Sequence, residues 1–341
     1  MSEMIRVLRG NWTESRHRGH VAVVDASGAL LHYLGDPFRP TFARSAMKPV
    51  QALPLVMSGA ADRFGFGPAD LALSCASHNG EERHRLRAAS MLARAGLRED
   101  VLECGFHPPR HRESHHEVIR KGVELTPVFS NCSGKHAGMV ATAAHLGEDP
   151  TGYSAPDHPV QRRILREVSA ITGCPEQEIV YGVDGCNVPA YRLPLDRLAL
   201  IYARLADPAS ISDRKRRGAA ERVTEAMVTH PEMVGGKERF CTDLMEAFRG
   251  CLVGKVGAEA VYCIGDRQQG IGIAVKIEDG AERVLYAAAV EVLRQLEIGT
   301  QTGELERLSA YTRPEVKNMR GRVVGRIEPD FELRSGEPAR W

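Results

Sequence analysis

The sequence predicts an α+β protein in which both ends of the chain form a central antiparallel sheet and a mainly helical lobe is inserted between them. Alternating apolar residues on either side of the turn Ala26-Ser27-Gly28 indicate a β-hairpin near the N-terminus. Further strand patterns gather in the last third of the chain, at 258–264, 271–277 and 322–327. We therefore expect one domain over residues 1–341, with a sheet lobe at about 1–60 plus 250–341 and a helical or mixed lobe at about 61–249.

Helical patterns dominate the middle of the chain. Residues 80–96 repeat apolar side chains with a helical period, which predicts an amphipathic helix. Its apolar side would carry Leu86, Ala89, Met91, Leu92 and Ala95. Asp157 before and Gly173 after residues 159–172 are typical start and stop signals of a helix. The histidine-rich stretch 105–116 has irregular spacing, so we interpret it as a surface or loop segment rather than a metal cluster. Other helices are expected at 137–146, 195–206, 214–229, 242–248 and 281–296, with a strand at 179–183.

Composition excludes several classes of function. The 341 residues carry a formal net charge of +1, which gives no basis for a nucleic-acid or membrane-surface partner. The first ten residues contain no apolar core of signal-peptide length, and no run approaches about 18 apolar residues. We therefore expect a cytoplasmic protein without a membrane span. Its eight cysteines are scattered in a chain too large to need disulfide staples, so reduced thiols or metal ligands are expected.

The stretch Arg44-Ser45-Ala46-Met47-Lys48-Pro49 places a serine three residues before a lysine. This spacing puts both side chains on one face of a helical turn, and a lysine that has lost its proton can activate a serine hydroxyl as a nucleophile. Proline is tolerated only in the first turn of a helix, so we expect Ser45 at the entrance of a helix that runs to Met57. Most such pairs are solvated helix residues. However, only eight of the 45 basic residues are lysine, which favours a required role for Lys48.

Four further runs carry reactive side chains. Ser77-His78-Asn79-Gly80 precedes the helix expected at 80–96, where a simple N-cap is the alternative interpretation. The run from Ser130 to His136 brings a thiol, an amine and an imidazole within one turn. Two more are Asp184-Gly185-Cys186-Asn187, after the strand at 179–183, and Lys255-Val256-Gly257, immediately before the strand at 258–264. Acyl transfer at a serine is the first hypothesis that these residues support.

The runs partly match the serine β-lactamases and penicillin-binding proteins, although Lys255-Val256-Gly257 lacks the hydroxyl residue of their Lys-Thr-Gly motif. A fuller resemblance covers nearly the whole chain. Five runs, in the same order, look like the rhizobial-type L-asparaginase II family: 44–51, 76–81, 130–139, 184–186 and 254–259. This resemblance implies a serine β-lactamase/glutaminase-like fold, hydrolysis of the small molecule L-asparagine to L-aspartate and ammonia, and a homodimer. It also implies two catalytic pairs, Ser45 with Lys48 and Ser77 with Lys255.

The same resemblance implies a zinc ion beside the serines, held by Cys132, Lys135 and Cys186 with a water in the remaining position. Lysine is a rare zinc ligand, and the residues alone would favour His136 over Lys135. The alternative is that the two cysteines are buried reduced thiols that pack as small hydrophobic side chains. Whether such a zinc ion orients substrate, activates water or is structural stays open.

For the reaction, we expect Lys48 to take the proton of Ser45 while Ser45 attacks the side-chain amide carbon. Ser77 and Lys255 would relay protons or hold the oxyanion. Arg44 or His78 could bind the α-carboxylate of the substrate and Asp184 its ammonium, although each could equally support the site without touching substrate.

Two departures from the family pattern make substrate preference less secure than reaction class. Asn187 stands where the family has glycine, and the loop at 235–237 is altered. Two other functions therefore remain open. One is a glutaminase or a β-lactam/D-amino-peptide hydrolase of the same fold, and the other is a non-catalytic zinc- or ligand-binding protein.

Overall fold

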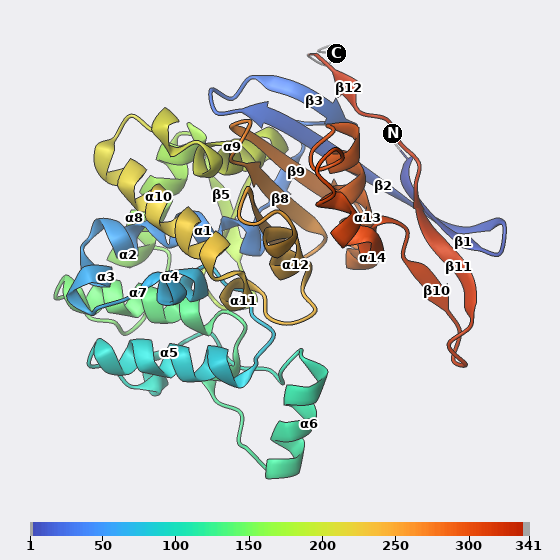
Figure 1. Cartoon of the computed structure of the whole chain (residues 1–341). Helices are drawn as coiled ribbons and strands as arrows, with labels where there is room; N and C mark the ends of the chain where they lie inside the picture. Colours follow the sequence, from blue (N-terminus) through green and yellow to red (C-terminus); the bar gives the residue numbers. More distant parts are fainter. Residues whose placement is uncertain (1–2, 337–341) are drawn as a thin grey trace. The chain divides into compact units, whose positions relative to one another are not determined.

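The computed structural model describes residues 3–336 (Figure 1). The chain forms two compact units. The sheet unit contains the residues up to Ala46, the segment Leu193–Asp207 and the residues from Ala247 onward. The helical unit contains Met47–Arg192 and Pro208–Glu246. Each unit is described separately below.

The sheet unit contains an antiparallel sheet built from both ends of the chain. Its strand order is β10-β11-β1-β2-β9-β8-β7, with β3 paired to β2 and β12 paired to β3. The N-terminal strands are β1 (Glu3–Arg9), β2 (Trp12–Asp25), β3 (Leu30–Leu34) and β4 (Pro40–Phe42). The C-terminal strands are β7 (Leu252–Gly257), β8 (Val261–Asp266), β9 (Ile271–Ile277), β10 (Glu315–Lys317), β11 (Val323–Pro329) and β12 (Arg334–Ser335). The predicted fold class, an α+β protein whose central antiparallel sheet joins the two chain ends, is confirmed.

The core of the sheet unit lies along β2 and β9. Four consecutive residues of β2, from Val21 to Val24, are fully buried, so both faces of this strand are covered. Helix α9 (Leu195–Ala206) contacts β9, β8 and β2, while α13 (Glu282–Gln295) contacts β9, β8, β11 and β1. Gly272 permits the close approach of α9, because a Cβ there would overlap the carbonyl oxygen of Ala199. Although α9 falls within the range expected for the helical lobe, it therefore belongs to the sheet unit.

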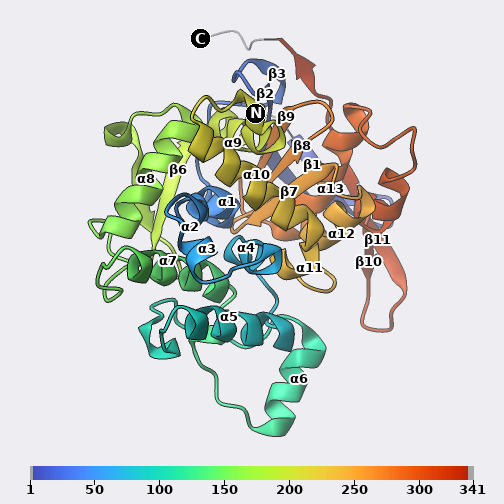
Figure 2. The same ribbon diagram turned by 60° about the vertical axis from the view of Figure 1, so that its left-hand side comes forward.

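The helical unit is organised around α7 (Ser133–His145), in which every residue from Ser133 to Ala143 is buried. Helices α4 (Pro68–Ser74), α5 (Glu82–Arg94) and α8 (Pro159–Thr172) contact α7, and Figures 1 and 2 both show α4 and α5 beside it. The small side chains of α7 permit this packing, because a Cβ at Gly134 would overlap Leu73 of α4. The remaining helices are α1 (Lys48–Gln51), α2 (Leu53–Met57), α3 (Ala60–Arg63), α6 (Arg112–Lys121), α10 (Arg214–Thr229), α11 (Pro231–Val234) and α12 (Phe240–Ala247). Strands β5 (Val180–Val183) and β6 (Pro189–Pro194) pair antiparallel.

Several sequence predictions differ from the structure. The helix expected from Ser45 to Met57 is divided into a 3-10 turn at Arg44–Met47, α1 and α2, and Pro49 and Pro54 each lie in the first turn of a short helix. On α5, Met91 and Leu92 are buried as predicted, but Leu86 is 64% exposed and His84 is buried instead, so the predicted apolar side was only partly correct. The stretch at 105–116, interpreted as a surface or loop segment, is mostly at the surface, and its last residues form the start of α6. By contrast, the predicted helices at 159–172, 195–206 and 214–229 and the strand at 271–277 are confirmed with the same bounds.

Candidate active site

Ser45 belongs to the sheet unit and lies in the 3-10 turn Arg44–Met47, immediately before α1. The turn is anchored at its end, where the Tyr202 hydroxyl of α9 donates to the carbonyl oxygen of Ala46 at 2.8 Å. Arg44 has a φ of 48°, a left-handed conformation that is uncommon for a residue with a side chain. Such strained backbone is often found at functional sites. The local structure therefore fixes the backbone of Ser45 and of the predicted carboxylate ligand Arg44.

Lys255 also belongs to the sheet unit, but it lies within β7 rather than before the first C-terminal strand. Its side chain is fully buried, and its Nζ donates to the carbonyl oxygen of Val256 at 2.9 Å. The prediction missed β7 because Gly254 and Gly257 interrupt its apolar pattern. Gly257 allows the end of β7 to lie against residues 43–46, since a Cβ there would crowd the carbonyl oxygen of Ala43. The sheet unit thus holds Arg44, Ser45 and Lys255 on fixed backbone.

In the helical unit, the Lys48 side chain is 1% exposed and has three neighbours that accept hydrogen bonds. Its Nζ donates to Ser77 Oγ at 2.9 Å, and it also donates to the carbonyl oxygen of Ala76. The Sγ atom of Cys132 lies 3.1 Å from the same nitrogen. The structure therefore brings together three predicted site residues, Lys48, Ser77 and Cys132, within one hydrogen-bonded cluster. The Lys48–Ser77 contact was not predicted from the sequence.

The segment that carries Ser77 connects α4 to α5. The N-cap of α5 is Glu81, whose side chain makes no capping hydrogen bond, so the N-cap interpretation of Ser77-His78-Asn79 was wrong. The Nδ1 atom of His78 accepts a hydrogen bond from the Gly80 backbone N–H, at 3.2 Å. The ring proton is therefore assigned to Nε2, which donates to Ser133 Oγ at 2.9 Å. Both nitrogens of the fully buried His78 are thus occupied within the protein.

The predicted metal ligands lie together in the helical unit. Cys132 is the N-cap residue of α7, and Lys135 is in the first turn of the same helix. Cys186 lies in the turn between β5 and β6, and its Sγ is 3.0 Å from Lys135 Nζ. The two thiols are hydrogen-bonded to each other, and both are buried. Two sulfurs and a nitrogen that meet in this way fit the donor preference of zinc.

The buried charges of this cluster shift the pKa values of its members. The hydrogen bond from Cys186 lowers the pKa of Cys132 well below its usual value despite burial, and the charges of Lys48 and Lys135 add to this effect. The same hydrogen bond and burial raise the pKa of Cys186. Burial alone would lower the pKa of Lys135, but the neighbouring Cys186 and Cys132 outweigh it and raise the pKa. The cluster therefore stabilises a thiolate at Cys132, the form in which cysteine binds metals.

Among residues 3–336, no group of three His, Cys, Asp or Glu side chains could hold a metal ion. A zinc site at Cys132 and Cys186 would therefore use Lys135 as its third protein ligand. His136, the ligand that the residues alone favoured, points its Nδ1 atom at the Tyr153 hydroxyl, 2.5 Å away. Its Nε2 atom is buried and has no hydrogen-bond partner in the described part of the chain.

Asp184, the predicted ligand of the substrate ammonium, opens the turn that carries Cys186. Its carboxylate accepts from the Gly185 backbone N–H at 2.6 Å, and its charge acts on Lys135. Asn187 ends the turn with a φ of 72°, and its Nδ2 donates to the carbonyl oxygen of Glu103 at 2.7 Å. Asparagine adopts this left-handed conformation more readily than most residues. It therefore fits where the family pattern has glycine.

The sequence and its fold were also compared with known proteins. The family model for L-asparaginase II matches residues 5–329. The chain belongs to the L-asparaginase II family. Membership of this family supports an amidohydrolase activity on a small-molecule substrate. No curated protein is significantly similar to the sequence.

The comparison with solved structures also matched proteins of low sequence identity to this L-asparaginase II family member. A β-lactamase from Mycobacterium bovis is 14% identical, with 81% of this chain and 94% of that chain covered and a TM-score of 0.39. A structure described as a putative β-lactamase, from Bacteroides dorei, is 11% identical, with 81% and 93% covered and a TM-score of 0.42. No helix within residues 3–336 is long and apolar enough to cross a membrane.

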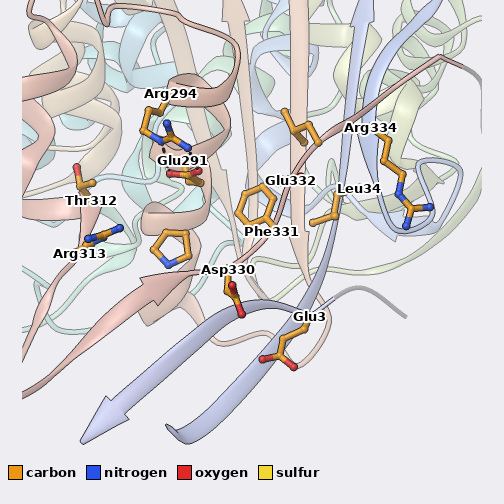
Figure 3. A pocket seen from close by; sticks show the side chains of 12 residues that line it. Glu3, Leu34, Glu291, Arg294, Thr312, Arg313, Asp330, Phe331, Glu332 and Arg334 are labelled. Carbon is orange, nitrogen blue, oxygen red and sulfur yellow. Dashed lines mark hydrogen bonds and ion pairs between the residues drawn. The ribbon is translucent and has the colours of Figure 1, made fainter. Parts of the chain in front are cut away.

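A separate cavity of about 1030 Å³ lies within the sheet unit of the L-asparaginase II chain (Figure 3). Figure 3 shows Glu291 and Arg294 of α13, paired with each other, on one side and Phe331 near its centre. None of the predicted site residues lines this cavity. This cavity is therefore not part of the candidate site.

Three buried histidines of this L-asparaginase II chain are expected to make its stability depend on pH. Burial lowers the pKa of His78, His84 and His136, so folding favours the neutral ring of each. In the unfolded chain a histidine takes up a proton near pH 6.5. Stability contributed by the neutral histidines is therefore present above pH 6.5 and is lost as the pH falls below it. The free energy of unfolding should fall by up to about 1.4 kcal/mol per pH unit for each histidine.

Urea unfolding at pH 7.5, 6.5 and 5.5 would measure how the free energy of unfolding changes with pH. These pH values lie above the range in which carboxylates ordinarily titrate. A His84→Gln variant should have a shallower slope than the wild type, because it removes one of the three histidines whose pKa burial lowers. An unfolding free energy that does not change between pH 7.5 and 5.5 would contradict the prediction.

Proposed function

We propose that the protein is an L-asparaginase that hydrolyses L-asparagine to L-aspartate and ammonia at a serine nucleophile. The observation that carries the proposal is the buried Lys48 amine, which donates to the Ser77 hydroxyl at 2.9 Å beside the Cys132 thiol. A buried lysine amine that is hydrogen-bonded to a serine hydroxyl can exchange protons with it, which supports a proton-transfer role for Lys48 in Ser–Lys catalysis. Membership of the L-asparaginase II family supports the reaction class.

In this proposal Ser45 is the nucleophile and Lys48 its base, an assignment that rests on their three-residue spacing at the start of α1. Ser45 Oγ attacks the side-chain amide carbon of asparagine, and its proton passes to the Lys48 amine. That proton then goes to the leaving nitrogen, which departs as ammonia and leaves an ester on Ser45. Water attacks the ester, aspartate is released, and the Ser45 hydroxyl is restored.

Ser77 and Lys255 are proposed to relay protons or to hold the oxyanion. A donor placed at a developing oxyanion is typically worth about 3–4 kcal/mol of transition-state stabilisation. Ser77 supports this role through its contact with Lys48, and Lys255 through its full burial on β7. The two residues would lower the barrier without forming a covalent bond to substrate.

For substrate binding we assign the α-carboxylate to Arg44 and the ammonium to Asp184. Arg44 is preferred over His78 because both ring nitrogens of His78 already have partners within the protein. A guanidinium binds a carboxylate through two parallel hydrogen bonds, which also fixes its orientation. We further propose that the enzyme is cytoplasmic and acts as a homodimer, and the family resemblance supports the homodimer.

We propose that zinc is the cofactor and that Cys132, Lys135 and Cys186 hold it. When bound, zinc would supply a Lewis acid that polarises a carbonyl oxygen or lowers the pKa of a bound water. The protein residues set up this site in advance, because the hydrogen bond from Cys186 and the nearby lysines already lower the pKa of Cys132.

Ammonia release should be measured with asparagine, glutamine and a β-lactam in parallel, with β-lactam opening followed by absorbance. We expect asparagine to be preferred over glutamine by at least about tenfold in kcat/KM, since one methylene group in a fitted pocket is typically worth 10- to 200-fold. Preference for glutamine or for the β-lactam would reject the asparaginase assignment. Turnover of none of the three would favour a zinc- or ligand-binding protein.

A further inference from the structure

Asn79 connects the segment that carries Ser77 to two other loops of the helical unit. Its backbone N–H donates to the carbonyl oxygen of Gly235 at 3.0 Å, and its side-chain Nδ2 donates to that of Lys237 at 2.9 Å. Its own carbonyl oxygen accepts from the backbone N–H groups of Arg110 and His111, at 2.8 and 3.0 Å. Through its side chain and its own backbone N–H and carbonyl groups, Asn79 thus forms hydrogen bonds with four backbone groups of other residues.

The neighbours of Asn79 are held in the same way. The Ser77 backbone N–H donates to the carbonyl oxygen of Val234 at 3.0 Å, on the same side as Asn79. The His78 backbone N–H donates to Asn131 on the opposite side, at 3.2 Å. The backbone N–H groups of residues 77–79 therefore donate alternately to segment 234–237 and to the loop that carries Cys132, as the backbone of a strand does.

The amide group of Asn79 lies directly against Gly236. Gly236 has a φ of 100°, and a Cβ at this position would overlap the Oδ1, Cγ and Nδ2 atoms of Asn79. Asn79 is 1% exposed, and its Oδ1 has no hydrogen-bond partner among residues 3–336. Burying an unpartnered acceptor is unfavourable for stability. Stability alone therefore does not explain why this amide is placed here.

We infer that Asn79, seated on Gly236, is a positioning residue that fixes Ser77 against Lys48. The inference rests on the proposed function, because it gives the Ser77–Lys48 contact a role in turnover. The contact is 2.9 Å long, and a displacement of 1 Å would break it. Asn79 itself acts only through the backbone of residues 77–79, which segment 234–237 holds in place.

Two variants disturb this arrangement from opposite sides. Asn79→Asp keeps the size of the side chain but removes the Nδ2 donor to Lys237. Gly236→Ala keeps Asn79 but pushes its amide away. Gly59→Ala is the matched control, because Gly59 also has a left-handed φ, of 88°, in the helical unit, yet a Cβ there would meet only His145 at 3.6 Å. The control therefore shares the backbone strain without the overlap.

Asparagine hydrolysis is measured first for the wild type, and its absence would reject the proposed function alone. For the inference, the readout is hydrogen exchange of peptides that cover residues 74–81 and 231–238, together with kcat and KM. In Asn79→Asp and Gly236→Ala we expect faster exchange in both peptides. We also expect kcat to be lowered at least about tenfold in these two variants, with KM changed less than threefold. Gly59→Ala should keep the exchange rates and the kcat of the wild type.

Hydrogen exchange does not depend on the reaction, so it tests the inference even if asparagine is not the substrate. Unchanged exchange in both variants would overturn the inference, as would a kcat equal to that of Gly59→Ala. Exchange that rises throughout the chain would also overturn it, because it would show that Asn79 supports the whole unit rather than the position of Ser77.

Discussion

Ammonia release from asparagine should fall by about 10³-fold or more when Ser45 is replaced by alanine, because loss of a nucleophile removes the covalent route entirely. The protein should remain folded, since the anchoring bond of this turn comes from the Ala46 carbonyl oxygen rather than from the Ser45 side chain. The measurement is kcat/KM for asparagine, with thermal unfolding as the check on folding. Wild-type turnover in Ser45→Ala would show that Ser45 is not the nucleophile.

Two comparison variants sharpen this experiment. Ser58→Ala removes a hydroxyl that donates to the Leu55 carbonyl oxygen and accepts from the Ala60 backbone N–H, and neither partner is a proposed site residue, so this variant should keep wild-type activity. Ser77→Ala should lower kcat by about 10²- to 10³-fold while an acyl-enzyme can still form on Ser45. Peptide mapping of the trapped acyl group distinguishes the two serines. An acyl group found on Ser77 would show that Ser77, and not Ser45, is the nucleophile.

The elements that could be predicted from the sequence are those with local signals. Helix α8 has the predicted bounds and ends at Gly173 in a left-handed conformation, although its N-cap is His158 rather than the predicted start signal Asp157. Helix α5 shows where local signals fail. Its buried side includes His84, whose Nε2 binds the carbonyl oxygen of Glu232, and this partner lies 148 residues away along the chain. Periodicity of apolar residues cannot reveal a polar side chain that is buried by a distant partner.

The candidate site shows the same division between local and distant information. The motifs and the family resemblance placed Lys135 beside Cys186, but they paired Ser77 with Lys255 and did not predict the contact of Ser77 with Lys48. The contact of Lys48 with Ser77 joins residues 29 apart, and that of Lys135 with Cys186 joins residues 51 apart. Asn79 carried only a turn or capping signal in the sequence. Its bond to Lys237 spans 158 residues, so its place could be found only from the folded chain.

Zinc binding is expected to be lost when both cysteines are removed. Wild-type protein purified without chelator should contain about one zinc ion per chain, and Cys132→Ser with Cys186→Ser should contain almost none, because serine does not provide the sulfur ligand that zinc prefers. Cys241→Ser is the matched control, since Cys241 is also buried in the helical unit but is not among the proposed ligands. Zinc content is measured by elemental analysis after gel filtration. Equal zinc in the double variant and the wild type would reject the site.

The same site should bind zinc more tightly as the pH rises. Cys186 and Lys135 both have raised pKa values without metal, so each carries a proton that zinc must displace. Each displaced proton contributes a tenfold gain in apparent affinity per pH unit, so two protons give about 100-fold between pH 6 and pH 7. Titration of metal-free protein with zinc at these two pH values measures the gain. A Lys135→Gln variant has one proton fewer to release, so its gain should fall to about tenfold, whereas an unchanged gain would remove Lys135 from the set of ligands.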